Sequence, residues 1–162
     1  MEYIKNTYTF PSHTGNTDIF VQTVEPRGDI KGVIQIVHGM AEHTNRYLEA
    51  ARYFADNGYA VIMHDHAGHG KSVKDDSMLG FFCEKDGYKR LVEDVKSVTE
   101  MAKKLWQGKK IVIWGHSMGS FITRNYLASF AGNVDGAVIC GTSGKNPAAG
   151  AGIALANIVC EL

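Results

Sequence analysis

The residues best suited to covalent chemistry lie in the stretch 115–119, which reads Gly-His-Ser-Met-Gly. A serine between glycines at a sharp strand-to-helix turn can act as a nucleophile, because the turn exposes the hydroxyl and leaves no room for neighbouring side chains. The preceding run, residues 111–114, is apolar and has the length of a buried strand, and residues 121–130 have the pattern of a helix. The sequence therefore predicts that Ser117 is a nucleophile placed at such a turn.

Attack of a serine on a carbonyl carbon also requires hydrogen-bond donors for the oxyanion that develops. The backbone N–H of Met118, at the start of the expected helix, is one candidate donor. The backbone N–H of Met40, in the loop after the apolar run 32–37, is the other. We expect Gly39, Met40 and Met118 to contact the substrate as well, since thioether side chains adapt to apolar acyl groups of varied shape.

The elements that must bring these residues together alternate along the chain. Residues 3–10 and 18–24 predict an antiparallel hairpin around a turn at 12–15. Further strands are expected at 32–37, 59–63, 111–114 and 134–140, and helices at 45–57, about 87–106 and 121–130. This alternation predicts an α/β fold with a mostly parallel sheet, in which ligands bind at the carboxyl ends of the strands.

Three sequence blocks, taken in order, resemble the α/β-hydrolase superfamily, and more narrowly its monoacylglycerol lipase, lysophospholipase and serine aminopeptidase-like branch. Residues 38–43, followed by Arg46 and Tyr47, are similar to the oxyanion loop of that branch; residues 65–72 are similar to its Asp-x-x-Gly-His-Gly-x-Ser loop. Residues 115–119 match its nucleophile elbow. The resemblance implies an α/β-hydrolase-type sheet, and a serine hydrolase that cleaves a carboxylic ester such as a monoacylglycerol or lysophospholipid through an acyl-enzyme on Ser117.

The same resemblance implies a catalytic triad in the chain order Ser, Asp, His, with the acid and the base after later strands. No further strand follows 134–140, so we expect residues 1–145 to be the N-terminal part of a hydrolase core, incomplete at its C-terminus. Residues 146–162 are expected to start a lid, or else to be an apolar helix separated from its packing partner. The triad Asp and His would lie in a missing C-terminal part, and this chain alone would be nearly inactive.

An incomplete sheet has a consequence for association. The strand at 134–140 would form an apolar edge, and such edges pair readily with other chains. We therefore expect either a C-terminal fragment of the same protein or a second copy of this chain to bind there.

The resemblance implies structural roles for the other polar residues of these blocks. The loop histidines, His38, His66 and His69, are tempting general bases, but in the family such residues shape the loop. His116 is expected to point away from the Ser117 hydroxyl, and Asp65 to order its loop. The spacing of His64, His66 and His69 fits no standard zinc pattern, so neither a metal nor another cofactor is expected.

Composition narrows the class of ligand and the compartment. The chain has 17 Lys and Arg against 17 Asp and Glu, with no long block of either sign, which argues against nucleic acid or an anionic membrane as a partner. A small amphipathic ester is the expected substrate. Residues 1–10 lack a signal peptide, the three cysteines lack disulfide or metal spacing, and residues 147–162 are too short for a membrane anchor. These features favour a cytoplasmic protein.

Two alternatives remain open from the sequence. A peptidase or a small-ester esterase of the same superfamily would share this half of the chain, because the lid and pocket that distinguish them lie elsewhere. A catalytically inactive binding or assembly module would share it too.

Overall fold

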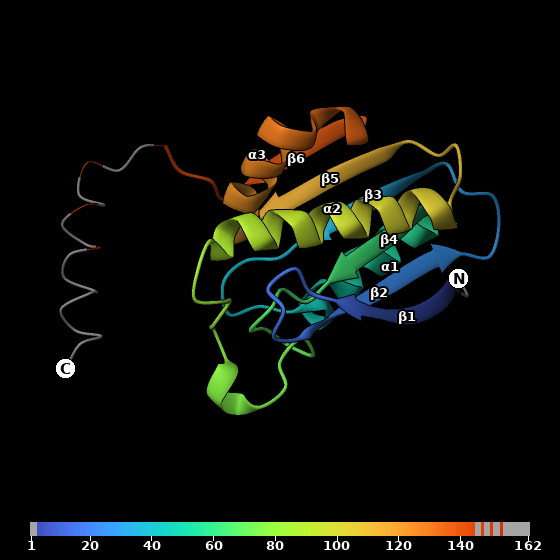
Figure 1. Ribbon diagram of the computed structural model, residues 1–162. Helices are drawn as coiled ribbons and strands as arrows, with labels where there is room; N and C mark the ends of the chain where they lie inside the picture. Colours follow the sequence, from blue (N-terminus) through green and yellow to red (C-terminus); the bar gives the residue numbers. More distant parts are fainter. Residues whose placement is uncertain (1–2, 145–146, 148–149, 151–152, 154–162) are drawn as a thin grey trace.

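The computed structural model describes residues 3–144 together with Pro147, Gly150 and Ile153. Its centre is a six-stranded sheet in the order β1-β2-β4-β3-β5-β6 (Figure 1). The strands are β1 (Tyr3–Pro11), β2 (Asp18–Pro26), β3 (Gly32–Val37), β4 (Tyr59–His64), β5 (Ile111–His116) and β6 (Gly136–Cys140). β1 and β2 form an antiparallel hairpin, β2 pairs antiparallel with β4, and the remaining neighbours are parallel. The predicted fold class is confirmed.

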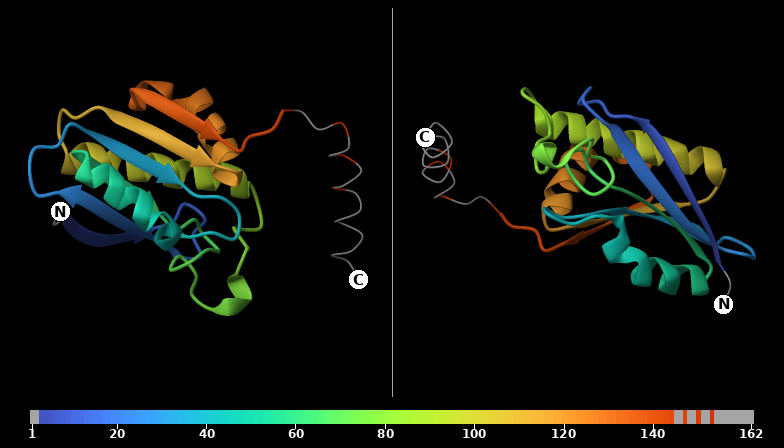
Figure 2. Two further views of the ribbon diagram at one scale, coloured as in Figure 1. Left: turned by 180° about the vertical axis from the view of Figure 1, so that it is seen from behind. Right: turned by 90° about the horizontal axis from the view of Figure 1, so that it is seen from below.

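Three α-helices cover the sheet: α1 (Leu48–Asp56), α2 (Gly87–Leu105) and α3 (Met118–Phe130). Short 3₁₀ turns lie at Thr44–Tyr47 (η1), Asp76–Met78 (η2) and Ala131–Asn133 (η3). α2 and α3 lie on one face of the sheet and α1 on the other (Figure 2). The helix expected from residue 45 begins as the η1 turn, and α3 begins three residues before its expected start, because the chain passes from β5 into the helix through Ser117 alone.

Two apolar cores follow from the alternation of side chains along the strands. Ile113 of β5, Val95 of α2 and Tyr126 of α3 are fully buried in the core under α2 and α3. Val61 of β4 and Ala51 of α1 belong to the smaller core under α1. A fully buried Val or Ile side chain contributes roughly 1.5–3 kcal/mol to folding, so both faces stabilise the sheet.

A buried carboxylate fixes the hairpin turn against α2. Asp94 is fully buried and accepts hydrogen bonds from Ser12 Oγ at 2.7 Å and from the backbone N–H of His13 at 2.8 Å. Burial raises the pKa of Asp94, and these hydrogen bonds oppose that rise. The two donors allow a charge-bearing group to be placed inside the interface between the hairpin and α2.

The strand order decides which loops can meet. β3 lies between β4 on one side and β5 on the other, so the direction in which strands are added reverses at β3. Val37 at the end of β3 lies opposite Gly115 near the end of β5. In parallel sheets such a reversal opens a crevice at the carboxyl ends of the strands. The loop after β3 and the turn after β5 meet at this place.

One face of the sheet is only partly covered by the described residues. α1 packs against β2 and β4, whereas no helix of the described part lies over β5 and β6 on that side (Figure 2). Val112, Trp114 and Val138 border a hollow of about 650 Å³ there, and Val138 is 50% exposed. The expected lid start at 146–162 lies outside the described residues, apart from Pro147, Gly150 and Ile153.

Candidate active site

Ser117 occupies a backbone conformation that L-residues rarely adopt, with φ 50° and ψ −120°. Such a conformation costs on the order of 1–3 kcal/mol and persists only where surrounding contacts enforce it. Here the Ser117 N–H donates to the Cys140 carbonyl at 2.9 Å, and the Ser117 carbonyl accepts from the Ser120 N–H at 2.9 Å and from Ser120 Oγ at 2.6 Å. The turn between β5 and α3 is therefore held by β6 and by the first turn of α3.

The two glycines of the box are required by close backbone approach. A Cβ at Gly119 would overlap the carbonyl oxygens of Val37 and His38. A Cβ at Gly115 would overlap Thr123 Oγ1 and lie 2.5 Å from the Gly119 carbonyl oxygen. The first turn of α3 thus lies directly on the end of β3.

The loop after β3 lies against the same turn. A Cβ at Gly39 would lie 3.0 Å from Ser117 Cβ and 3.0 Å from Glu42 Oε2. The Gly39 N–H donates to Glu42 Oε2 at 2.8 Å, and its carbonyl oxygen is 2.7 Å from His38 Nδ1. Met40, the next residue, has a 54% exposed side chain, and Met118 is the first residue of α3. All four predicted site residues, Gly39, Met40, Ser117 and Met118, therefore lie at one edge of the sheet.

Four histidines from β4 and the loops beside it form a buried layer beneath this edge: His38, His64, His66 and His69. His38 Nε2 accepts from the His66 N–H at 3.0 Å, so its proton is on Nδ1 and is donated to the Gly39 carbonyl. His66 Nε2 is 3.2 Å from the His38 carbonyl, and His69 Nδ1 is 3.1 Å from the Ala67 carbonyl. These are backbone contacts that shape loops.

Burial keeps the imidazoles of His38, His64 and His66 neutral. It lowers the pKa of His38 to about 4 and the pKa of His64 to about 3, and it lowers the pKa of His66 well below its ordinary value. Neither ring nitrogen of His64 has a hydrogen-bond partner among the described residues. None of the seven histidines hydrogen-bonds to Ser117 in the described part of the chain.

Asp65, at the end of β4, joins two loops. Its carboxylate accepts from the Thr44 N–H at 2.6 Å and from the Lys71 N–H at 2.8 Å, and its carbonyl accepts from Ser72 Oγ at 2.7 Å. Asp65 is 1% exposed, and it ties the start of η1 to the Gly-rich loop 65–72. Its contacts are those expected of a loop-ordering residue.

Glu42 is the residue of this site that sequence reasoning did not single out. It is 8% exposed and accepts from Tyr47 Oη at 2.6 Å in addition to the Gly39 N–H. His116, which precedes the serine, has Nδ1 3.5 Å from Glu42 Oε2. Glu42 belongs to the sequence block that carried the resemblance, but nothing in its spacing indicates a buried carboxylate.

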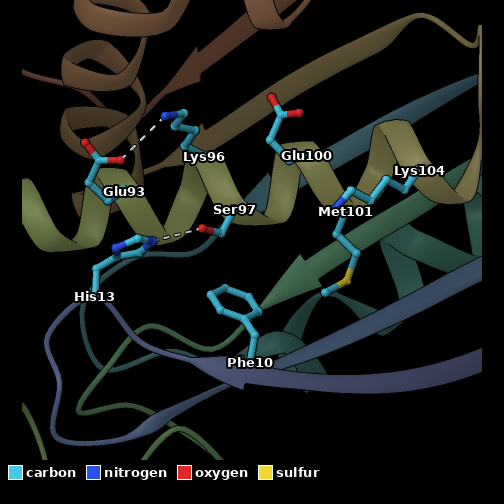
Figure 3. A pocket seen from close by; sticks show the side chains of 8 residues that line it. All are labelled: Phe10, His13, Glu93, Lys96, Ser97, Glu100, Met101 and Lys104. Atoms are coloured by element: carbon cyan, nitrogen blue, oxygen red, sulfur yellow. Dashed lines mark hydrogen bonds and ion pairs between the residues drawn. The ribbon is translucent and has the colours of Figure 1, made fainter.

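Two hollows differ in their relation to the serine. One of about 520 Å³ lies beside the loop after β3 and includes Met40 and Leu79 in its lining. Another, of about 460 Å³, lies between the hairpin turn and α2, where Phe10 and Met101 face each other and His13 Nε2 is 3.0 Å from Ser97 Oγ (Figure 3). Only the first adjoins the predicted oxyanion loop. Within the described residues, no group of three or more His, Cys, Asp or Glu side chains is placed to hold a metal ion.

Comparisons with known proteins identify relatives of this chain. A sequence profile described as serine aminopeptidase, S33, matches residues 28–159. Human monoglyceride lipase is 32% identical over 130 residues, which are 78% of this chain and 41% of that protein. Monoacylglycerol lipase from Mycolicibacterium smegmatis is 32% identical over 127 residues, 78% of this chain and 43% of that protein.

A solved structure extends the comparison to the fold. A thermostable carboxyl esterase from Bacillus coagulans, in complex with glycerol, superposes with a TM-score of 0.87 at 32% identity, covering 97% of this chain and 51% of the esterase. The chain thus spans about two fifths to one half of the length of these relatives.

Replacing Gly119 tests the contact between α3 and β3. We expect Gly119→Ala to lower the free energy of unfolding by about 2 kcal/mol or more, because the atoms that must move are backbone carbonyls. Gly132→Ala is the matched control, since a Cβ there meets nothing within 4 Å, and we expect it to stay within about 0.5 kcal/mol of the wild type. Urea denaturation measures both; equal effects would contradict the proposed contact.

The buried imidazoles predict loss of stability in weak acid. Between pH 6.5 and about 4 the unfolded chain binds protons at His38 and His64 that the folded chain does not, so stability falls as pH falls, by about 1.4 kcal/mol per pH unit per imidazole. His64→Leu should reduce the slope of stability against pH by about 1.4 kcal/mol per pH unit, which corresponds to one proton. The substitution removes no hydrogen bond, because neither ring nitrogen of His64 has a partner among the described residues. Denaturation series from pH 7 to 4 measure the slopes. Identical slopes in the wild type and His64→Leu would show that His64 is not kept neutral by folding.

Proposed function

Because this chain belongs to the serine aminopeptidase (S33) family of α/β-hydrolases, we propose that it supplies the nucleophile and the oxyanion site of a carboxylic ester hydrolase. The observation that carries the proposal is the strained Ser117 turn, whose serine lies against the loop of Gly39 and Met40. Strained backbone of this kind concentrates at functional sites. A serine needed only for packing would not require a positive φ.

In the proposed reaction, Ser117 Oγ attacks the ester carbonyl carbon, the ester C–O bond breaks, and the alcohol leaves with a proton. Water then hydrolyses the acyl-enzyme and releases the carboxylic acid and free Ser117. The N–H groups of Met40 and Met118 donate to the oxyanion; the N–H of Met118 is suited to this role because the first N–H groups of a helix have no intrahelical acceptor. The proton of Ser117 must pass to a base, and no histidine of the described residues hydrogen-bonds to Ser117. We assign the triad His and Asp to polypeptide beyond the described residues, in the order implied by the family.

The substrate that we propose is amphipathic, such as a monoacylglycerol or a lysophospholipid. Support comes from the names of the relatives and from the hollow beside the oxyanion loop, where Met40 is 54% and Leu79 is 59% exposed. Exposed apolar side chains at the mouth of a hollow suit an acyl chain.

Among the described residues, no helix combines the length and the hydropathy of a membrane-spanning segment. A cytoplasmic location belongs to the same proposal, supported by the free thiols of Cys83 and Cys140.

A fluorophosphonate probe, applied to the full protein in its active assembly, tests the nucleophile. We expect labelling and ester turnover that disappear in Ser117→Ala, with a fall in kcat of about 10⁴-fold or more. Ser97→Ala is an informative control, because Ser97 also pairs with an imidazole, that of His13 (Figure 3), and should keep both. Labelling that persists in Ser117→Ala would refute the assignment, and turnover of peptides rather than esters would favour the peptidase alternative.

We further propose that another polypeptide segment completes the sheet at β6. The basis is the partly covered apolar face beside Trp114 and Val138, the exposed side chains of β6, and the relatives, which are about twice as long. A strand pairing with β6 and a helix with an apolar stripe over Trp114 would bury this surface. The segment that we propose is the C-terminal part of the same protein, and without it the chain is expected to self-associate.

Self-association of the 162-residue chain is therefore a measurable outcome. Sedimentation should detect particles larger than the 17.7 kDa monomer at micromolar concentration. Val138→Lys, which places a charge in the middle of the edge strand, should shift the population to monomer, whereas Tyr53→Lys on α1, at a 66% exposed position, should not. A wild-type chain that stays monomeric and stable would contradict the proposal.

A further inference from the structure

We propose that Glu42 is a positioning residue that holds the oxyanion loop and the nucleophile turn in a fixed relation. The inference rests on the proposed function, because it assigns Glu42 a role in the geometry of the Met40 donor. It is carried by four groups that converge on one carboxylate. They are the Gly39 N–H at 2.8 Å, Tyr47 Oη at 2.6 Å, Arg46 Nε at 3.0 Å and His116 Nδ1 at 3.5 Å.

The first contact fixes the His38–Gly39 peptide, which directly precedes the peptide that carries the Met40 donor. Glu42 holds the N–H of Gly39, while His38 holds its carbonyl oxygen. In a trans peptide the carbonyl of Gly39 and the N–H of Met40 point in opposite directions. The Met40 N–H is therefore kept on the side away from the His38 ring, and rotation of this peptide would break the His38 contact. Glu42 limits such rotation through the neighbouring peptide, because it holds the Gly39 N–H.

The remaining contacts anchor the carboxylate to elements outside the loop. Tyr47 belongs to η1 and is buried, and its ring packs edge-on against Trp114 of β5 at 5.9 Å between centroids. His116 is the residue before the nucleophile, and its Nδ1 lies 3.5 Å from Glu42 Oε2. Glu42 thus joins the loop after β3, which carries the Met40 donor, to η1 and to the end of β5. The end of β5 leads through Ser117 to the Met118 donor.

The charge of Glu42 is consistent with a positioning role. Burial raises the pKa of Glu42, but the hydrogen bonds from Tyr47 and Gly39 and the charge of Arg46 outweigh it, so the pKa lies below its ordinary value. Glu42 is therefore ionised at neutral pH, as a strong acceptor for the Gly39 N–H. An apolar residue of similar size could fill the space at lower desolvation cost, but it could not hold that N–H.

The decisive variants change the acceptor that Glu42 offers to the Gly39 N–H and to its other partners. Glu42→Leu removes it, Glu42→Asp keeps the charge but withdraws it by one methylene, and Glu42→Gln keeps an oxygen that can accept from Gly39. Arg46→Gln is the matched control, because it removes the ion pair at a 67% exposed partner and leaves the Gly39 contact intact. All four are compared with the wild type in the full protein.

Hydrogen exchange at the Gly39 amide, measured by NMR, reads the loop directly. We expect exchange about tenfold faster or more in Glu42→Leu and Glu42→Asp, and within about threefold of wild type in Glu42→Gln and Arg46→Gln. Unchanged exchange in Glu42→Leu overturns the inference, whether or not the protein hydrolyses esters. If Glu42→Leu does not fold, Glu42→Asp decides by the same criterion.

Ester kinetics measure the effect of the Glu42 variants on catalysis. Loss of an oriented oxyanion donor should lower kcat by about 10²–10³-fold with KM within about threefold, and Glu42→Gln should recover most of that loss. A rise in KM at unchanged kcat would overturn the inference by assigning Glu42 to substrate binding. A wild-type protein that hydrolyses no ester would refute the proposed function instead, and the exchange measurement would still decide whether Glu42 holds the loop.

Discussion

The architecture of the site depends on the direct contact between the first turn of α3 and the end of β3. Gly119 lies on the carbonyls of Val37 and His38 with no space for a side chain. This contact brings the helix N-terminus, the strained Ser117 and the loop of Gly39 within van der Waals reach of one another. A larger separation would relax the turn, but it would also separate the two backbone donors proposed for the oxyanion.

A layer of buried polar groups supports that contact from below. His38, Asp65 and Glu42 are all nearly inaccessible, and each bonds to backbone N–H or carbonyl groups of a loop at the carboxyl edge of the sheet. Loops rarely bury their backbone, since its polar groups would lack partners. Side chains supply those partners here, which allows irregular segments to lie against the sheet as rigid parts of the site.

The described residues supply only part of the proposed catalytic site. The described residues contain the predicted nucleophile, both predicted oxyanion donors and the side chains that support the loops, whereas none of their histidines hydrogen-bonds to Ser117. The same residues leave the face beside Trp114 and the edge of β6 partly open. The relatives are about twice as long. We therefore propose that one further segment both completes the sheet at β6 and supplies the triad His and Asp.

The sequence by itself determined the elements and the family. Periodicity located all six strands and three helices to within a few residues, because burial on one face imposes a repeat that local sequence must show. The blocks at 38–43, 65–72 and 115–119 identified the superfamily, and the family match at 28–159 confirms it. Their order predicted that they meet at one edge of the sheet, without specifying which strands are neighbours.

Only the tertiary structure decided the rest. The placement of β3 between β4 and β5 depends on long-range strand pairing, which no local pattern encodes. The role of Glu42 likewise required the fold, because its partner His116 is 74 residues away and becomes a neighbour only when β3 and β5 pair. A carboxylate in a loop has the sequence signature of a solvated residue, and its burial follows from what the strands bring around it.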